Sequence, residues 1–159
     1  MIDEIDVKIL TILQTDARIA NAEIARRLDM APSAILERIR KLEAKGVIAG
    51  YEARLNPEAL GLGLMAFVFV RTDERVGEVS VGELLTRVPE VQEVHHIAGE
   101  DCYLARVRTK DTASLGRLLR ETFGAIPSVR STRTTVVLST AKDMRGLPLD
   151  GLAKERTGD

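Results

Sequence analysis

The spacing of apolar residues changes part-way along this chain of 159 residues, and that change constrains the fold more than any other feature. Up to Gly46, isoleucine and leucine recur every three or four residues, which is the period of an amphipathic α-helix. From Leu64 the pattern differs, because "LMAFVFVRT" is a continuous apolar run of strand length. The chain is therefore predicted to contain a helical unit followed by a unit built on a β-sheet.

Three helices are predicted in the first unit, within residues 3–16, 21–28 and 31–46. Asp3 is a suitable N-cap for the first helix, and Asp29 suits the turn before the third because aspartate tolerates left-handed backbone. Each helix has one apolar face, formed in turn by Ile5, Ile9, Ile12 and Leu13, by Ile24, Ala25 and Leu28, and by Ile35, Ile39 and Leu42.

The last two of these helices, joined by a very short turn, have the arrangement of a helix-turn-helix. Residues 26–45 carry six basic and three acidic side chains, although the net charge of the whole chain is −1. Arg and Lys on an outer helix face can contact guanine or phosphate, and Glu can accept from cytosine. The predicted contacts with double-stranded DNA are Ser33, Glu37, Arg38, Arg40 and Lys41. The alternative is a three-helix bundle whose solvated face happens to be basic.

The second unit is predicted to be an α+β domain with the order β-α-β-β-α-β. Its strands fall in residues 64–72, 91–99, 101–109 and 129–140, and its helices in residues 78–88 and 111–127. This order is typical of the ferredoxin-like fold, in which two helices cover one face of a four-stranded sheet. The expected organisation is a helix-turn-helix domain over 1–50, a strand and hinge connector over 51–61, the ferredoxin-like domain over 62–141 and a tail over 142–159.

Two helices leave the other face of such a sheet bare. Phe67 or Phe69, Tyr103, Val136 and Leu138 are expected to supply apolar surface there. Surface of this kind needs a partner, so the sequence predicts that a second copy of the chain covers this face.

Several motifs of the chain together resemble those of the Lrp/AsnC (feast/famine) transcription regulators. They are "D-x-K-I-L-x-x-L-Q-x-D-A-R", "E-[LI]-A", "R-[IV]-x-x-L-E-x-x-G-V-I-x-G-Y" and the Asn-Pro-Glu that follows, and the resemblance extends over residues 3–142. It implies a winged-type helix-turn-helix whose recognition helix spans residues 32–45, followed by an effector-binding RAM domain. It also implies homodimers that assemble further, for example into an octamer. Ala20 and Ala31 depart from the family, which usually has Ser at both helix caps.

The hairpin tip "AGEDCY" is the candidate effector site. A glycine tip exposes N–H donors for a carboxylate, and neighbouring acids can accept from an ammonium, so the tip suits a free amino acid. The resemblance matches the family's sensing motif and its last strand to Gly99, Glu100, Asp101, Cys102, Tyr103, Thr132 and Thr134. Cys102 stands where many members have Asp. The alternative is a plain hairpin turn whose acids keep the sheet edge soluble.

Metal binding and catalysis are the competing interpretations of this stretch. His95 and His96 are adjacent, so on a strand they face opposite sides and cannot easily share one metal with Cys102. Cys102 and a nearby His could form a nucleophile pair, and a few relatives of this architecture resemble sirohaem decarboxylases. An effector-binding protein without a DNA role also stays open. No catalytic residue, metal ligand or cofactor is predicted.

The composition favours a cytoplasmic protein. A single cysteine cannot form an intrachain disulfide, which fits a reducing compartment. No apolar run approaches the roughly 18 residues that a membrane span requires, so no membrane partner is expected.

Overall fold

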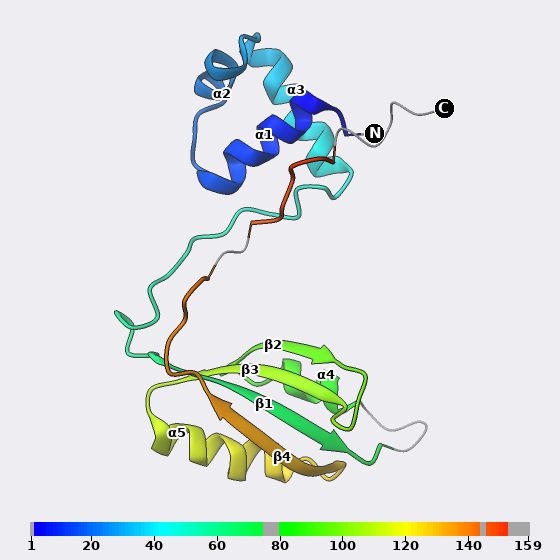
Figure 1. Cartoon of the computed structure of the whole chain (residues 1–159), viewed down its shortest axis with the longest axis vertical. Coiled ribbons are helices and arrows are strands. Elements are labelled where there is room, and N and C mark those ends of the chain that lie inside the picture. Colours follow the sequence, from blue (N-terminus) through cyan, green and yellow to red (C-terminus); the bar gives the residue numbers. More distant parts are fainter. Residues whose placement is uncertain (1, 75–79, 144–145, 153–159) are drawn as a thin grey trace. The chain divides into compact units, whose positions relative to one another are not determined.

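The computed structural model describes residues 2–74, 80–143 and 146–152. The chain divides into two compact units (Figure 1). One comprises the residues up to Arg54 together with the described part of the chain from Asp143 onward, and the other comprises Leu55–Lys142. Among the described residues, no helix has the length and apolar character needed to cross a lipid bilayer.

The first unit is a bundle of three helices, α1 (Glu4–Thr15), α2 (Asn21–Leu28) and α3 (Pro32–Ala44). Their predicted apolar faces meet in one core, whose buried residues are Ile9, Ile24, Ala25, Ile35, Ile39 and Leu42. The helix positions therefore agree with the predicted periodicity, and α2 and α3 form the helix-turn-helix pair.

The ends of these helices follow from local chemistry. Asp3 is the N-cap of α1, where its side chain accepts from the Asp6 backbone N–H. Ala20 and Ala31 occupy the N-caps of α2 and α3 without any side-chain hydrogen bond, which leaves orphan donors at both helix starts. Asp29 ends α2 in the left-handed conformation, with φ 53°, as the turn requires.

The strand expected in the connector is absent, since the described residues between α3 and Leu64 contain no strand. Just before the connector, Val47 and Ile48 also have strand-type composition, but both backbone N–H groups donate to the carbonyl of Leu42 at the end of α3. A strand also needs a hydrogen-bonded neighbour, and the sheet of the second unit does not include this segment. The segment directly after α3 instead turns back onto the end of that helix.

The second unit is a four-stranded antiparallel sheet in the order β2-β3-β1-β4. Its strands are β1 (Leu64–Thr72), β2 (Val91–His96), β3 (Tyr103–Thr109) and β4 (Val129–Val136). The helix α4 (Val81–Thr86) follows β1, and α5 (Thr112–Arg117) follows β3. This is the predicted α+β, ferredoxin-like arrangement.

The two faces of the sheet differ along the central strand β1. Ala66, Val68 and Val70 are fully buried against side chains of α4 and of the segment after β3, including Leu85 and Phe123. The alternate residues, Met65, Phe67 and Phe69, lie half-buried on the opposite face. We call this second surface the open face of the sheet.

Tyr103 does not lie on the open face, contrary to the prediction. It pairs with Val70 across the sheet and is 7% exposed within the core between the sheet and α4. Val136 pairs with Ala66 and so also stands on the helix-covered side. Phe67 and Phe69 do lie on the open face, because they alternate with the buried residues Ala66, Val68 and Val70. The pairing of Tyr103 with Val70 places the tyrosine on the buried face instead.

The single helix predicted over 111–127 is a composite. After α5 the chain continues as a π-helical turn η1 (Leu118–Thr122) and a 3₁₀ turn η2 (Phe123–Ala125). A π turn holds an extra residue and rotates the register. Leu118 and Phe123 thereby become buried, while Leu119 remains only half-buried.

Gly82 on α4 lies directly against the ring of Tyr103. A Cβ at this position would lie 2.6 Å from Cε1 of Tyr103. The ring cannot easily retreat, because its hydroxyl lies 3.0 Å from Oγ of Ser80 and donates to Glu74 at 3.2 Å. Glu74 in turn accepts from the Val81 N–H at the start of α4.

Gly82→Ala is therefore expected to lower the free energy of unfolding by about 1–3 kcal/mol, the usual cost of overpacking a core. Urea denaturation of the full chain would measure it. Gly63→Ala is the matched control, because its Cβ would lie 3.7 Å from the Glu58 Cγ, an ordinary contact. Intrinsic helix propensity favours Ala by about 1 kcal/mol, so a stabilised Gly82→Ala protein would contradict the close-approach argument.

Candidate functional site

The outer face of α3 carries four of the five side chains predicted to contact DNA. Ser33, Glu37, Arg40 and Lys41 are all exposed. Lys41 Nζ lies 2.6 Å from Oε1 of Glu37, one turn earlier, with about two thirds of each side chain exposed (64% and 67%). This hydrogen bond and charge hold the pKa of Glu37 below its usual value. An exposed ion pair of this kind is weak, so Lys41 remains free to exchange partners.

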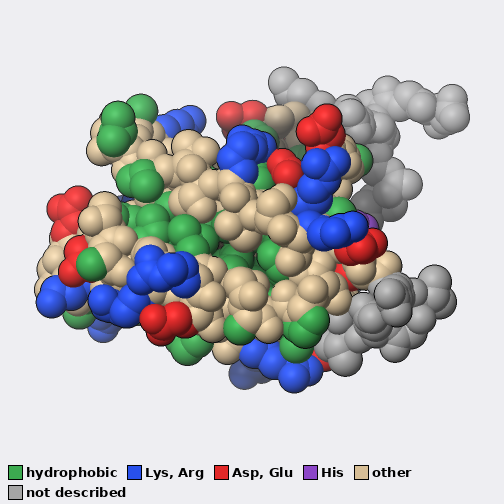
Figure 2. Space-filling view, turned by 90° about the horizontal axis from the view of Figure 1, so that it is seen from below, with side chains coloured by type: hydrophobic (Ala, Val, Ile, Leu, Met, Phe, Trp, Pro, Cys, Tyr) green, Lys and Arg blue, Asp and Glu red, His purple; other side chains and the backbone are tan. Residues whose placement is uncertain are grey.

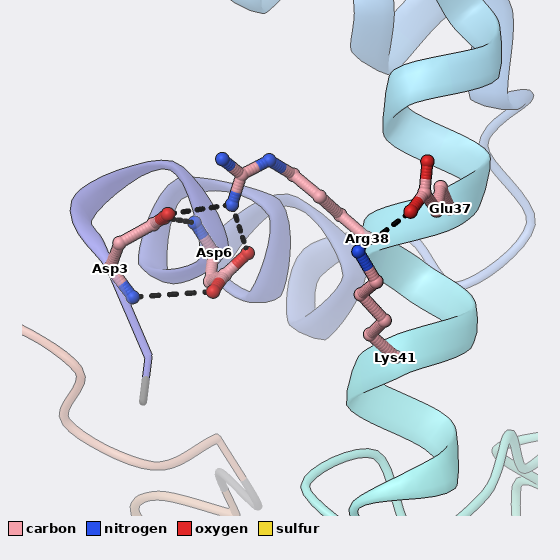
Figure 3. A network of polar contacts seen from close by, with 5 residues as sticks. All are labelled: Asp3, Asp6, Glu37, Arg38 and Lys41. Carbon is pink, nitrogen blue, oxygen red and sulfur yellow. Dashed lines mark hydrogen bonds and ion pairs between the residues drawn. The ribbon is translucent and has the colours of Figure 1, made fainter.

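Arg38, the fifth, has different surroundings (Figure 3). Its Nη1 lies 2.7 Å from Oδ2 of Asp3 and 2.7 Å from Oδ1 of Asp6, both at the start of α1. Only 29% of the Arg38 side chain and 12% of the Asp6 side chain are exposed. The hydrogen bonds to Asp3 and then to Asp6 raise the pKa of Arg38. Both contacts direct the guanidinium toward the start of α1.

The two carboxylates are held in place by the capping geometry of α1. The Asp6 N–H donates to Asp3 at 2.8 Å, and the Asp3 N–H donates back to Asp6 at 3.2 Å, which completes a capping box. The backbone hydrogen bond from Asp6 is the main cause that lowers the pKa of Asp3, to which Arg38 adds. The spacing Asp-x-x-Asp could have revealed the capping box from the sequence, but nothing local pointed to Arg38.

Other basic residues of the unit are paired as well. Glu23 accepts from both Arg26, at 2.7 Å, and Arg27, at 2.9 Å, and these hydrogen bonds lower its pKa to about 2. On the face of the molecule in Figure 2, the Lys and Arg side chains form separate groups interspersed with acids and hydrophobic side chains.

The predicted effector tip lies between β2 and β3. Gly99 has a φ of 144°, which other residues rarely adopt, and a Cβ there would meet open space. The Cys102 N–H donates to the Val70 carbonyl and its own carbonyl accepts from the Ile97 N–H, so the tip is tied to the central strand. Glu100 is exposed and Cys102 is half-buried against the core.

Asp101 joins this tip to the last strand. Its Oδ2 accepts from Arg133 Nη2 at 2.9 Å, and the Arg133 guanidinium carbon lies 4.0 Å from the centre of the Phe69 ring. The tip and the "TRT" segment, which are far apart in the sequence, therefore meet, but through Arg133. Thr132 and Thr134 pair with Val70 and Val68 and so stand on the other side of the sheet.

The two histidines have different neighbours on the two sides of β2. His96 stacks on Tyr103 with ring centroids 5.0 Å apart, and His95 lies 3.5 Å from Glu93 on the opposite side of the strand. Within the described residues, no three His, Cys, Asp or Glu side chains come close enough to hold a metal ion.

Solved structures with the same fold cover nearly the whole chain. A transcriptional regulator from Neisseria meningitidis, in a crystal structure with L-Met, superposes with a TM-score of 0.88 at 29% identity, over 96% of this chain and 99% of that one. The feast or famine regulatory protein from M. tuberculosis complexed with L-methionine gives a TM-score of 0.85 at 34% identity, over 92% and 99%.

Sequence comparison agrees with the fold. Residues 2–49 match the winged helix-turn-helix DNA-binding model, and residues 65–147 match the Lrp/AsnC ligand binding domain. HTH-type transcriptional regulator FL11 of Pyrococcus horikoshii is 40% identical over 93% of this chain and 97% of its own length. Leucine-responsive regulatory protein of Escherichia coli is 37% identical over 92% and 90%. Fold and sequence together define an effector-responsive, DNA-binding transcriptional regulator. The chain belongs to the Lrp/AsnC family.

The capping carboxylate Asp3 gives a prediction about pH. Because folding lowers the pKa of Asp3, its contribution to stability is present above the ordinary value of 3.8 and is lost as the pH falls through the lower folded value. Asp3→Asn keeps a capping oxygen but not the charge. The free energy of unfolding of wild type should therefore exceed that of Asp3→Asn at neutral pH, and the difference should shrink below pH 3.8.

Urea denaturation across this pH range would measure the difference. Asp29→Asn is the matched control, because it also removes one carboxylate from the unit and Asn tolerates the left-handed backbone at that position. A wild-type advantage that is unchanged or larger in acid would show that the Asp3 charge does not stabilise the fold.

Proposed function

We propose that the chain is a transcription regulator that reads double-stranded DNA with α3 and is controlled by a free amino acid bound near the β2–β3 tip. The observation that carries the proposal is the outer face of α3. Glu37, Arg40 and Lys41 stand exposed on a helix that follows a short turn and is fixed from behind by a complete apolar core.

Each side chain of this face suits a particular kind of DNA contact. Arg40 and Lys41 can bind guanine edges or phosphates, and the Ser33 hydroxyl at the first turn of α3 can bind a phosphate. Glu37 forms an ion pair with Lys41 in the free protein. When Lys41 moves to a phosphate, the carboxylate of Glu37 can accept a hydrogen bond from cytosine. A dimer would place two such helices in successive major grooves, which gives sites with twofold symmetry.

The effector proposal depends on charges that converge at the sheet edge. Arg133 offers a guanidinium for a ligand carboxylate, while Asp101 and Glu100 offer oxygens for an ammonium. The Gly99 backbone leaves the tip open to a ligand. Two related regulators were crystallised with L-methionine, which supports a similar class of ligand here. Tyr103, being buried, would support the tip from behind, and Cys102 would vary the ligand preference.

We propose further that the protein is a cytoplasmic homodimer that assembles into larger oligomers and has no membrane partner. The open face carries Met65, Phe67, Phe69 and Leu104, all half-buried in the single chain. A second copy would cover this apolar surface. We also propose that the protein is not an enzyme, because relatives that are 37–40% identical are named as transcriptional regulators.

The double substitution Arg40→Ala and Lys41→Ala is expected to weaken DNA binding and to flatten its dependence on salt. Removing one phosphate contact should lower the slope of log K against log salt concentration by about 0.9. Fluorescence anisotropy with a duplex selected by the wild-type protein from a random pool would measure both quantities. Lys110→Ala with Arg120→Ala removes the same charge from exposed sites in the other unit. Equal effects of the two double variants would mean that α3 makes no special contact.

Asp101→Asn is expected to reduce the affinity for the amino-acid effector at least about tenfold, because it removes a charge-assisted hydrogen bond to the ammonium. Titration calorimetry of wild type against the twenty amino acids would first identify the ligand. Glu83→Gln, which neutralises an exposed carboxylate on α4, is the control. Full affinity in Asp101→Asn, or no heat from any amino acid with wild type, would exclude this site or this ligand class.

A further inference from the structure

The contact between Arg38 and the start of α1 has a consequence for DNA recognition. Arg38 joins residues that lie 32 and 35 positions earlier in the chain, and one nitrogen serves both carboxylates at 2.7 Å. We infer that Arg38 is a positioning residue: it fixes α3 against the first turn of α1 and so aims the side chains that read DNA. This inference rests on the proposed DNA-binding function and assigns Arg38 a role different from that of Arg40 and Lys41.

The charge of the cluster argues against a direct phosphate contact by Arg38. One guanidinium faces two carboxylates, so the three side chains together carry a net charge of −1 at neutral pH. With its charge already matched by carboxylates, Arg38 attracts a phosphate less than an unpaired cation would. The arginine would also have to leave Asp6, whose side chain is only 12% exposed, and an abandoned buried carboxylate is costly.

The geometry of the helix explains how this contact can aim the reading side chains. Successive residues of an α-helix are about 100° apart, so around the axis of α3 Arg38 lies about 60° from Lys41 and about 160° from Arg40. Holding Arg38 to α1 therefore limits the rotation of α3 about its own axis. The apolar contacts of Ile35, Ile39 and Leu42 restrict this rotation less, because apolar packing is less directional than a hydrogen bond. Contacts to base edges require directed hydrogen bonds and so depend on this rotation, whereas contacts to phosphates tolerate it.

The inference is tested with Arg38→Gln, Asp6→Asn and the double variant. Two duplexes of equal length are used as probes: one selected by the wild-type full-length protein from a random pool, and a scrambled version of it. Anisotropy titrations over a range of salt give both affinities, and a stoichiometric titration gives the fraction of active protein. Asp3→Asn, at a more exposed position that keeps its cap, serves if either of the other single variants fails to fold.

Positioning predicts that each single variant loses about tenfold in affinity for the selected duplex, roughly the value of one base contact. The affinity for the scrambled duplex and the salt slope should not change. Asp6→Asn should show this loss even though it removes a negative charge, and the double variant should lose no more than a single one, because both changes break the same contact.

Other outcomes would overturn the inference. If Arg38→Gln weakens binding to both duplexes and lowers the salt slope by about 0.9, Arg38 contacts a phosphate directly. If Asp6→Asn tightens binding, the carboxylate acts only as a repelling charge. If the active fraction falls while the remaining molecules keep their preference, the contact serves folding alone. Equal affinity of wild type for all duplexes would refute the proposed function itself.

Discussion

The alternating burial along β1 is the constraint on which the second unit depends. β1 is the central strand and pairs with both β3 and β4, so its register fixes the facing of their side chains. A slip of one residue would exchange its buried valines for Phe67 and Phe69. The same register places Arg133 directly opposite Phe69, where its guanidinium covers the ring and reaches Asp101. The strand that organises the core thus also assembles the candidate effector site.

Elements whose residues carry their own pattern could be predicted from the sequence. The strand over 64–72 and the helix over 21–28 have the predicted bounds, because hydrophobic periodicity and end signals are local. The strand predicted after α3 was wrong for the opposite reason, because a strand depends on a distant partner. The Val47 N–H bonds to the end of α3 instead. The helix predicted over 111–127 was wrong in detail, because after α5 it continues as a π turn that precedes the buried Phe123, and apolar spacing alone does not distinguish such a turn from an α-helix.

The candidate sites show the same difference between local patterns and contacts with distant residues. The exposure of Glu37, Arg40 and Lys41 follows from helix geometry and could be predicted. The partner of Arg38 could not, because the residues that bind it lie more than thirty positions away and only the packing of α1 on α3 brings them close. The contact of Asp101 with Arg133 is likewise a product of strand order. Local motifs mark both segments of that site, but only the strand register decides that Arg133, rather than Thr132 or Thr134, faces the tip.

The distribution of ion pairs explains how a chain with a net charge of −1 can bind a polyanion. Exposed pairs such as Lys41 with Glu37 are worth little in water, so a phosphate can replace the carboxylate at small cost. The half-buried contact of Arg38 resists the same exchange, because separating it would leave Asp6 enclosed without its cation. Burial therefore decides which cations are available to DNA and which hold the reading helix in place. Because α3 carries only Arg40 and Lys41 besides the paired Arg38, tight binding would need two copies of α3 on one DNA, which the proposed dimer would supply.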